Sequence, residues 1–310
     1  MHFNRFYQLV KKSVNAWIDD YAPSMGAAIS YYTIFSLAPL LIIVIAVAGA
    51  VFGQEAVQGQ IVAQLSGLIG KDGASAVQGL IKSASDPAKG VVASVVSFVV
   101  LAVGATTVFA ELQSALDRIW HVPEKAKPSG IWGLVRSRFL SFGLVLGLAF
   151  MMMISLVVSA GLAAFGSWSS GLVRGWEVLL QVLNVVVSLF ITTLLFAMIY
   201  KLMPSVKIAW RDVWVGAAVT SVLFEVGKLG IGLYIGKSGV TESFAAAGSL
   251  VVLLAWVYYA TQIFLLGAEF TKVYAADAAE NASAAHIPAA DKTDVSQVSN
   301  TPDVPQRRSA

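Results

Sequence analysis

The sequence has no cysteine and only three histidines, His2, His121 and His286, which lie far apart. Without cysteine there can be no disulfide, no thiolate metal ligand and no cysteine nucleophile. The histidines form no HxH or HExxH pattern, which is the spacing that places imidazoles together around a metal. We therefore expect neither a histidine-rich metal site nor a cofactor.

Charge is also scarce, since only 13% of the residues are charged and 57% are hydrophobic. A soluble globular domain has about 25% charged residues, so the composition indicates that lipid is the solvent. The net charge of +3 is small, and Lys and Arg are spread along the chain. Without a basic patch, nucleic acid is not an expected partner.

Long apolar runs dominate what is present. A helix needs about 20 apolar residues to cross a bilayer, and it satisfies its own backbone. Five uncharged runs qualify, and a sixth is interrupted by only two charges. The sequence thus predicts an all-α polytopic membrane protein, with six transmembrane helices near 28–52, 90–112, 139–164, 178–202, 213–236 and 244–270.

The basic residues predict the orientation, because Lys and Arg in short loops are retained in the cytoplasm. With six alternating spans, fifteen Lys and Arg fall on the side of the two termini and five on the other. We expect a bacterial inner-membrane protein with both termini in the cytoplasm. A cleaved signal peptide is disfavoured, because Asp19 and Asp20 precede the first run, where a basic leader belongs.

The parts outside the spans show three patterns. Residues 3–21 place apolar side chains at helical spacing, which predicts an interfacial amphipathic helix. The longest outer loop, 54–89, predicts two short amphipathic helices that cap the outer face. Residues 276–310 lack periodicity and predict a disordered cytoplasmic tail after a membrane domain of residues 1–275.

Glu225 and Lys228 interrupt the fifth span, roughly 18 and 22 Å along it from Val213 at 1.5 Å per residue. A charge near the bilayer centre costs at least about 2.5 to 3.5 kcal/mol on insertion scales. Their i, i+3 spacing places both on one helix face. Two interpretations stay open: a pathway or site for a charged or zwitterionic substrate, and a structural ion pair between helices.

The first span is polar in its first half, where Ser30, Tyr32 and Thr33 precede Pro39. Ser30 and Thr33 share a face and are candidates to line a substrate pathway with Tyr32, or they bond to the carbonyl one turn back. Pro39 removes a backbone hydrogen bond and predicts a kink.

Glycines crowd the fifth span, and they predict either close helix packing or a hinge. They are Gly227, Gly230, Gly232 and Gly236, of which the last two form a GxxxG pattern. In the last span, Trp256, Tyr258 and Tyr259 predict packing, and Glu269 with Lys272 favours a surface or interfacial pair over a proton relay. No P-loop, dinucleotide fingerprint or GxSxG is present, so we expect no enzyme activity.

Three separated segments resemble the YihY/BrkB family of bacterial inner-membrane proteins. They are GAAISYYTIFSLAPLLIIVIAVAG (26–49), ALDRIW (115–120) and GSLVVLLAWVYYATQIFLLGAEFTKVYA (248–275), within a resemblance that covers about residues 5 to 275. The family's usual asparagine in the middle segment is Asp117 here. The resemblance implies a six-helix protein linked to serum resistance and to envelope lipid or lipopolysaccharide export.

Some members carry a ribonuclease BN label, which this sequence disfavours because it has no cluster of His and acidic ligands for a metal. Our leading hypothesis is a transporter, flippase-like protein or envelope-biogenesis factor that handles an amphipathic or charged substrate. A non-transporting membrane scaffold is the alternative, and a tRNA-processing ribonuclease is a remote one. The expected partners are the lipid bilayer and a lipid or other amphipathic substrate, and a homo-oligomer is compatible with the sequence.

Overall fold

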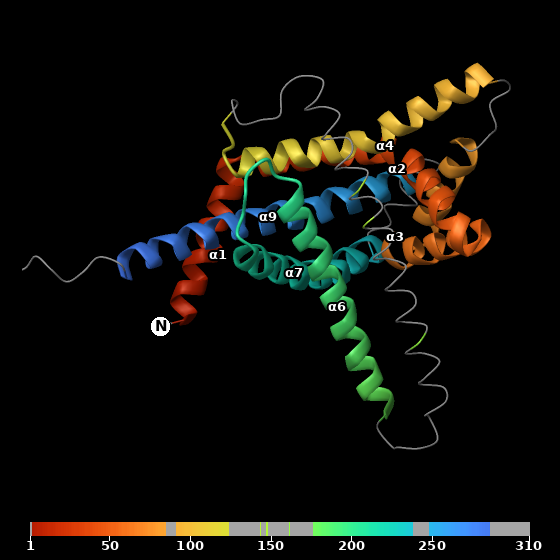
Figure 1. Cartoon of the computed structure of the whole chain (residues 1–310). Coiled ribbons are helices and arrows are strands. Elements are labelled where there is room, and N and C mark those ends of the chain that lie inside the picture. The colour runs from red at the N-terminus through yellow and green to blue at the C-terminus, as the bar shows by residue number, and fades with distance from the viewer. Residues whose placement is uncertain are drawn as a thin grey trace, which may run out of the picture. The chain divides into compact units, whose positions relative to one another are not determined.

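The computed structural model describes residues 2–84, 91–123, 176–237 and 248–285, together with Gly143, Gly147 and Gly161 (Figure 1). Within these ranges every regular element is an α-helix. The helices are α1 (His2–Asp19), α2 (Ala22–Phe52), α3 (Gln54–Ala84), α4 (Val91–Ile119), α6 (Trp176–Leu202), α7 (Trp210–Lys237) and α9 (Gly248–Ala285).

Four segments of the described chain are long and apolar enough to cross a membrane. They are Ala22–Ala50, Val185–Leu202, Trp210–Ile231 and Leu250–Ala282, which correspond to the first, fourth, fifth and sixth predicted spans. α4 forms a helix over the second predicted span. The third, 139–164, lies outside the described residues except for its three glycines.

The chain turns sharply between α1 and α2. Tyr21 has a φ of 57°, in the left-handed region, and Pro23 lies in the first turn of α2, where a proline loses no helical hydrogen bond. α1 buries Leu9 and Ser13, whose hydroxyl donates to the Leu9 carbonyl at 2.8 Å. The predicted N-terminal helix is therefore present, and its interfacial position stays a prediction.

α2 continues as one helix through Pro39. At that point α4 approaches it closely, because a Cβ built on Gly104 would lie 3.2 Å from Cγ of Pro39. The glycine therefore lets the proline ring and the α4 backbone pack in contact.

Where two short helices were predicted in the first outer loop, α3 is one helix of 31 residues. The prediction was wrong because Gly70 and Gly73 between the two apolar stretches weaken a helix without stopping it. α3 packs Val77 and Ile81 in a cluster with Leu253 of α9 and with apolar residues of α2 between Ile34 and Ile45. It therefore lies along α2.

The main core gathers the ends of four helices and the middle of a fifth. It combines the start of α2, the end of α4, the end of α6, the start of α7 and the middle of α9, with Met25, Leu116, Tyr200, Val213 and Leu265 among its buried side chains. α6 and α7 therefore run in opposite directions, and the ends of α4 and α6 meet at one end of the bundle.

A hydrogen-bonded contact holds α6, α7 and α9 together in this core. Tyr200 is buried, and its hydroxyl donates to the Phe264 carbonyl at 2.7 Å and lies 3.1 Å from Oγ1 of Thr220. Two glycines allow the approach: a Cβ on Gly216 would lie 1.8 Å from Oγ1 of Thr271, and one on Gly267 would lie 1.9 Å from Oγ1 of Thr220.

α9 continues to Ala285, so it includes the first ten residues of the predicted tail, 276–285. This stretch suits a helix because AADAAENASAA is rich in alanine, the best helix former. The chain divides into two compact units, Met1–Tyr274 and Ala275–Ala310. Of the second unit, the structure describes only the end of α9, and residues 286–310 lie outside the described ranges.

Candidate functional site: an ion pair in α7 and a buried charge cluster at α9

Glu225 and Lys228 form an ion pair within α7, with Oε2 of the glutamate 2.7 Å from Nζ of the lysine. The i, i+3 spacing makes this contact possible, as the sequence indicates. The side chains are 34% and 30% exposed, so neither is sealed inside a helix contact. Both charges lie within the segment Trp210–Ile231, which is apolar enough to cross a membrane.

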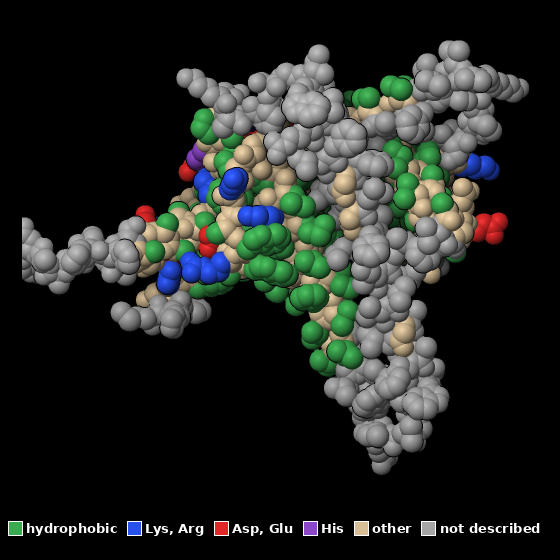
Figure 2. Space-filling view, viewed as in Figure 1, with side chains coloured by type: hydrophobic (Ala, Val, Ile, Leu, Met, Phe, Trp, Pro, Cys, Tyr) green, Lys and Arg blue, Asp and Glu red, His purple; other side chains and the backbone are tan. Residues whose placement is uncertain are grey.

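Apolar side chains surround the pair along the outside of α7. Val222, Val226 and Leu229 are exposed, Leu229 to 72%. In the view of Figure 2, hydrophobic side chains likewise cover the described part of α6, where Val185, Val186 and Phe190 are among the exposed residues. The ion pair therefore lies on a helix whose open face is otherwise suited to lipid.

The glycines of α7 have different environments. A Cβ on Gly227 would lie 2.5 Å from Cδ1 of Ile263 and 3.1 Å from the Tyr259 ring, so this glycine packs tightly against α9. Gly230 is less confined, at 3.8 Å from the Tyr259 hydroxyl. Gly232 and Gly236 belong to α7, but their surroundings lie outside the described residues. Close packing is thus the local role of Gly227.

The hydroxyl groups of the first span satisfy their own helix. Ser30 donates to the Gly26 carbonyl and Thr33 to the Ile29 carbonyl, both at 2.7 Å, while the Tyr32 ring stacks edge-on against Tyr31. In the part of the chain that the structure describes, no hydrogen bond or ion pair joins Ser30, Tyr32 or Thr33 to Glu225 or Lys228. The structure therefore does not bring these pathway candidates together.

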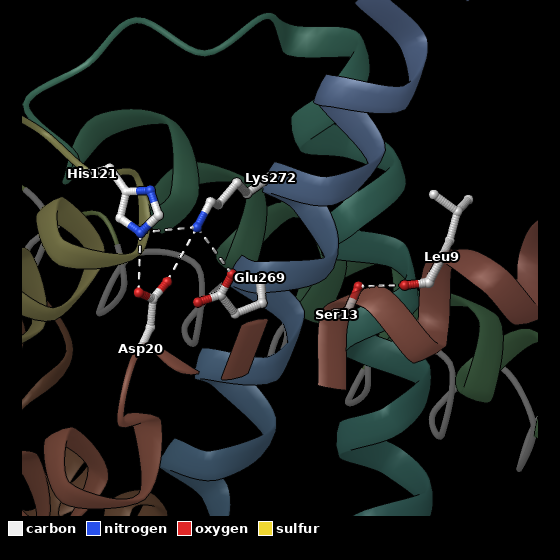
Figure 3. Close-up of polar contacts among 6 residues, drawn as sticks. All are labelled: Leu9, Ser13, Asp20, His121, Glu269 and Lys272. Carbon is white, nitrogen blue, oxygen red and sulfur yellow. Dashed lines mark hydrogen bonds and ion pairs between the residues drawn. The ribbon is translucent and has the colours of Figure 1, made fainter. Parts of the chain in front are cut away.

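A second group of charges lies at the end of the bundle where the main core gathers (Figure 3). Oδ1 of Asp20 is 3.0 Å from Nε2 of His121, and Oδ2 of Asp20 is 3.1 Å from Nζ of Lys272. Lys272 also pairs with Glu269 at 3.5 Å. This charge cluster, Asp20, His121, Glu269 and Lys272, joins the α1–α2 turn, the second residue after α4, and α9.

The expected pair of Glu269 with Lys272 is present, but Glu269 is 0% exposed, so its expected place at the surface was wrong. The error has a physical reason, since the α1–α2 turn and the end of α4 cover this part of α9, and neither is near it in sequence. The pattern GAEFTK gives one local signal, a carboxyl and an ammonium at i, i+3 directly after an apolar span. It does not identify Asp20 and His121 as the other members.

The backbone is unusual at one residue of the charge cluster and at a residue directly beside it. Among the described residues other than glycine, Tyr21 and His121 are the ones with positive φ, at 57° and 48°. Such a conformation is uncommon for residues with a Cβ, and it is often found where function or packing imposes it. Tyr21 directly follows Asp20, and its ring lies 5.8 Å from the Arg118 guanidinium, which further attaches the end of α4 to the turn.

The pKa of Asp20 is lowered below its ordinary value. Burial raises it, but hydrogen bonds from His121, Glu269 and Lys272 and the charge of Lys272 outweigh the burial. Because these partners favour the ionised carboxyl, Asp20 is the anion of the charge cluster.

Asp117, the departure from the family's asparagine, is buried and holds the connection between α6 and α7. Its two oxygens accept from the Ser205 backbone N–H at 2.7 Å and the Ser205 hydroxyl at 2.8 Å. Lys201 donates to the Ile208 carbonyl in the same connection.

Within the described ranges, no group of three or more His, Asp or Glu side chains is placed to hold a metal ion.

Comparisons with known proteins agree with this architecture. The family model described as "Virulence factor BrkB" matches residues 14–292. A UPF0761 membrane protein of Ralstonia nicotianae is 28% identical over 254 residues, which cover 81% of this chain and 55% of that protein. One of Pseudomonas aeruginosa is 25% identical over 271 residues, covering 86% and 62%.

The first of these relatives are longer than this chain, which spans 55% to 62% of their length. A UPF0761 membrane protein of Pseudoalteromonas translucida is closer in size: it is 28% identical over 261 residues, which cover 83% of each chain. No solved structure matches the chain.

Proposed function

Since this chain belongs to the BrkB family of membrane proteins, we propose that it is a transporter or flippase-like protein of the bacterial inner membrane that moves an amphipathic or charged substrate. The observation that carries the proposal is the Glu225–Lys228 ion pair in an apolar helix. Its charged atoms are 2.7 Å apart, and each of the two side chains is about one third exposed. The protein would act without catalysing a reaction of its own.

Six crossings with both termini in the cytoplasm form part of the proposal. Six alternating spans require that the start of α2, the ends of α4 and α6, the start of α7 and the end of α9 lie on one side. The main core gathers the first four of these helix ends together with residues 264–268 of α9, which lie just before the predicted end of the sixth span at 270. This arrangement supports that topology. The side they share would be the cytoplasmic one, because the basic residues concentrate there.

The ion pair suits a zwitterionic or amphipathic head group. Each charge neutralises the other while the site is empty, which offsets the cost of placing them in lipid. When a substrate enters, its anionic group can pair with Lys228 and its cationic group with Glu225. An apolar tail would pass along the exposed apolar side chains Val222, Val226 and Leu229.

The test replaces the pair in a strain whose envelope phenotype depends on the protein. We expect Glu225→Gln and Lys228→Met to reduce activity about tenfold or more, since a hydrogen bond to a charged group contributes about 1.5 to 3 kcal/mol. The double variant should accumulate normally and stay inactive. Glu55→Gln removes an exposed carboxyl at the start of α3 and should behave like the wild type.

The double variant separates this function from a structural role. Removing both members of a structural ion pair is often neutral or stabilising. Full activity of the double variant at normal membrane levels would therefore contradict the transport proposal and leave the pair as a packing contact.

A non-transporting scaffold is the second candidate, and the exposed apolar face of α1 favours it. Phe6, Tyr7, Val10, Val14 and Ile18 are exposed along this helix, so it offers a surface for the membrane or for a partner. Deleting residues 286–310, beyond the end of α9, discriminates between the two functions. A transporter should keep its activity after this deletion, and a scaffold that binds through its tail should lose it.

A further inference from the structure

The charge cluster contains two carboxyl groups and one permanent cation. Asp20 and Glu269 both lie beside the Lys272 ammonium, at 3.1 and 3.5 Å. With His121 neutral and both carboxyl groups ionised, the charge cluster would carry one negative charge around a side chain that is 0% exposed. Burying an uncompensated charge is costly, so one added proton would make the charge cluster neutral.

The surroundings of Glu269 indicate which group holds that proton. Both of its oxygens are buried without a hydrogen-bond partner among the described residues, and its contact with Lys272 is the ion pair at 3.5 Å. An ionised carboxyl whose oxygens accept no hydrogen bond is costly to bury. Asp20, in contrast, has hydrogen-bond contacts with both His121 and Lys272, so Glu269 is the carboxyl that the added proton neutralises.

His121 connects Asp20 to water. Its side chain is 66% exposed, and its Nε2 lies 3.0 Å from Asp20 and 3.5 Å from Lys272 Nζ. Imidazole is the side chain best suited to exchange protons near neutral pH. Figure 3 shows the contacts that link His121 to Glu269: His121 contacts Asp20 and Lys272, Lys272 contacts Asp20, and Lys272 pairs with Glu269.

The polar face of α9 continues beyond Glu269. Gln262 lies seven residues earlier, two helical turns away on the same face. Its amide atoms are buried without a hydrogen-bond partner. The amide lies against Gly26 of α2, where an added Cβ would be 1.9 Å from Nε2 of Gln262. An unsatisfied buried amide is costly in an apolar segment, so Gln262 marks a polar position deeper along the same helix.

We propose that Glu269 is a proton-binding site, with His121 as the group that exchanges the proton with solvent. The groups that face Glu269 are Asp20 from the α1–α2 turn and Lys272 from α9. At the start of α7, Asp212 pairs with Arg211 instead.

The transfer balances as one proton. One proton enters from solvent at His121 and one proton is bound by Glu269, so the net charge of the charge cluster rises by one. The inference extends the proposed function by naming a proton as the ion that is coupled to transport. Only this coupling rests on the proposed transport function, and the proton-binding site itself does not.

Infrared difference spectroscopy of the purified full chain in lipid nanodiscs tests the site without any transport assay. Between alkaline and neutral pH, we expect the C=O stretching band of a protonated carboxylic acid to appear in the wild type. Glu269→Gln should lose this band. Glu280→Gln, which removes an exposed carboxyl of the same helix, should retain it. Where Glu269→Gln does not accumulate, Glu269→Asp should shift the band.

His121→Asn tests the access route, because it alters an exposed side chain and leaves both carboxyl groups in place. We expect the band to persist and its hydrogen-to-deuterium exchange to slow. An unchanged band in Glu269→Gln, or in Glu269→Asp where that variant replaces it, would overturn the proton site. Unchanged exchange in His121→Asn would overturn the role of His121. Inactive Glu225 and Lys228 variants would bear only on the proposed function, so the two failures are distinguishable.

Discussion

Nε2 of His121 lies 3.0 Å from Oδ1 of Asp20, although 101 positions separate the two residues. This contact attaches the second residue after α4 to the turn between α1 and α2. Lys272 of α9 binds the other oxygen of Asp20, so a single carboxylate holds three distant parts of the chain together. The end of the bundle that contains the main core is therefore fixed by charge as well as by apolar packing.

Asp20 should make stability depend on pH in the acid range. Its folded-state pKa lies below the ordinary value of 3.8, so its contribution is fully present above the unfolded pKa. The contribution disappears as pH falls through the folded pKa. We expect Asp20→Asn to lower the apparent Tm in detergent at neutral pH, by the equivalent of about 1 to 3 kcal/mol. The difference from the wild type should shrink in acid. An equal difference at every pH would contradict this role.

Tyr200→Phe should destabilise the bundle without changing the shape of its core. The variant loses the hydrogen bond to the Phe264 carbonyl and the contact with Thr220, which together contribute about 1 to 3 kcal/mol at a buried position. Thermal unfolding followed by size-exclusion chromatography measures the loss. Tyr31→Phe is the control, because Tyr31 is exposed. If both variants unfold at the same temperature, the Tyr200 contacts do not hold the helices together.

Gly216→Ala should prevent close packing of α7 on α9. The new methyl group would lie 1.8 Å from Oγ1 of Thr271 and 2.7 Å from its Cβ, so the helices must separate. We expect a large loss of folded protein in the membrane. Gly79→Ala is the matched control: a Cβ there meets nothing within 4 Å, and alanine should stabilise α3 by about 0.5 to 1 kcal/mol. Equal yields of the two variants would refute the packing argument.

Features that depend on local spacing could be predicted from the sequence. The Glu225–Lys228 contact follows from i, i+3 geometry, and four of the six predicted spans coincide with described segments that are apolar enough to cross a membrane. α3 was predicted wrongly because apolar periodicity does not show whether a helix continues across two glycines. The end of α9 was missed because a polar, alanine-rich sequence suits both a helix and a disordered tail.

The charge cluster could not be predicted, because it depends on packing between distant parts of the chain. Asp20, His121 and Lys272 lie in three separate regions, with 252 positions between the first and the last. The sequence places Glu269 and Lys272 on one face of a helix, and nothing local indicates that the α1–α2 turn covers them. The hydrogen bond from Ser205 to Asp117, which lies 88 positions away, is a second example.

The central claim is that Glu225 and Lys228 line a water-accessible path through the membrane. The chain has no cysteine, so single cysteines can be introduced at 225, 228 and 229 without background. A membrane-impermeant methanethiosulfonate reacts with thiolates, which form only where water reaches. We predict labelling of Glu225→Cys and Lys228→Cys in intact membranes, and none of Leu229→Cys on the apolar face. Equal protection of all three positions would contradict the account.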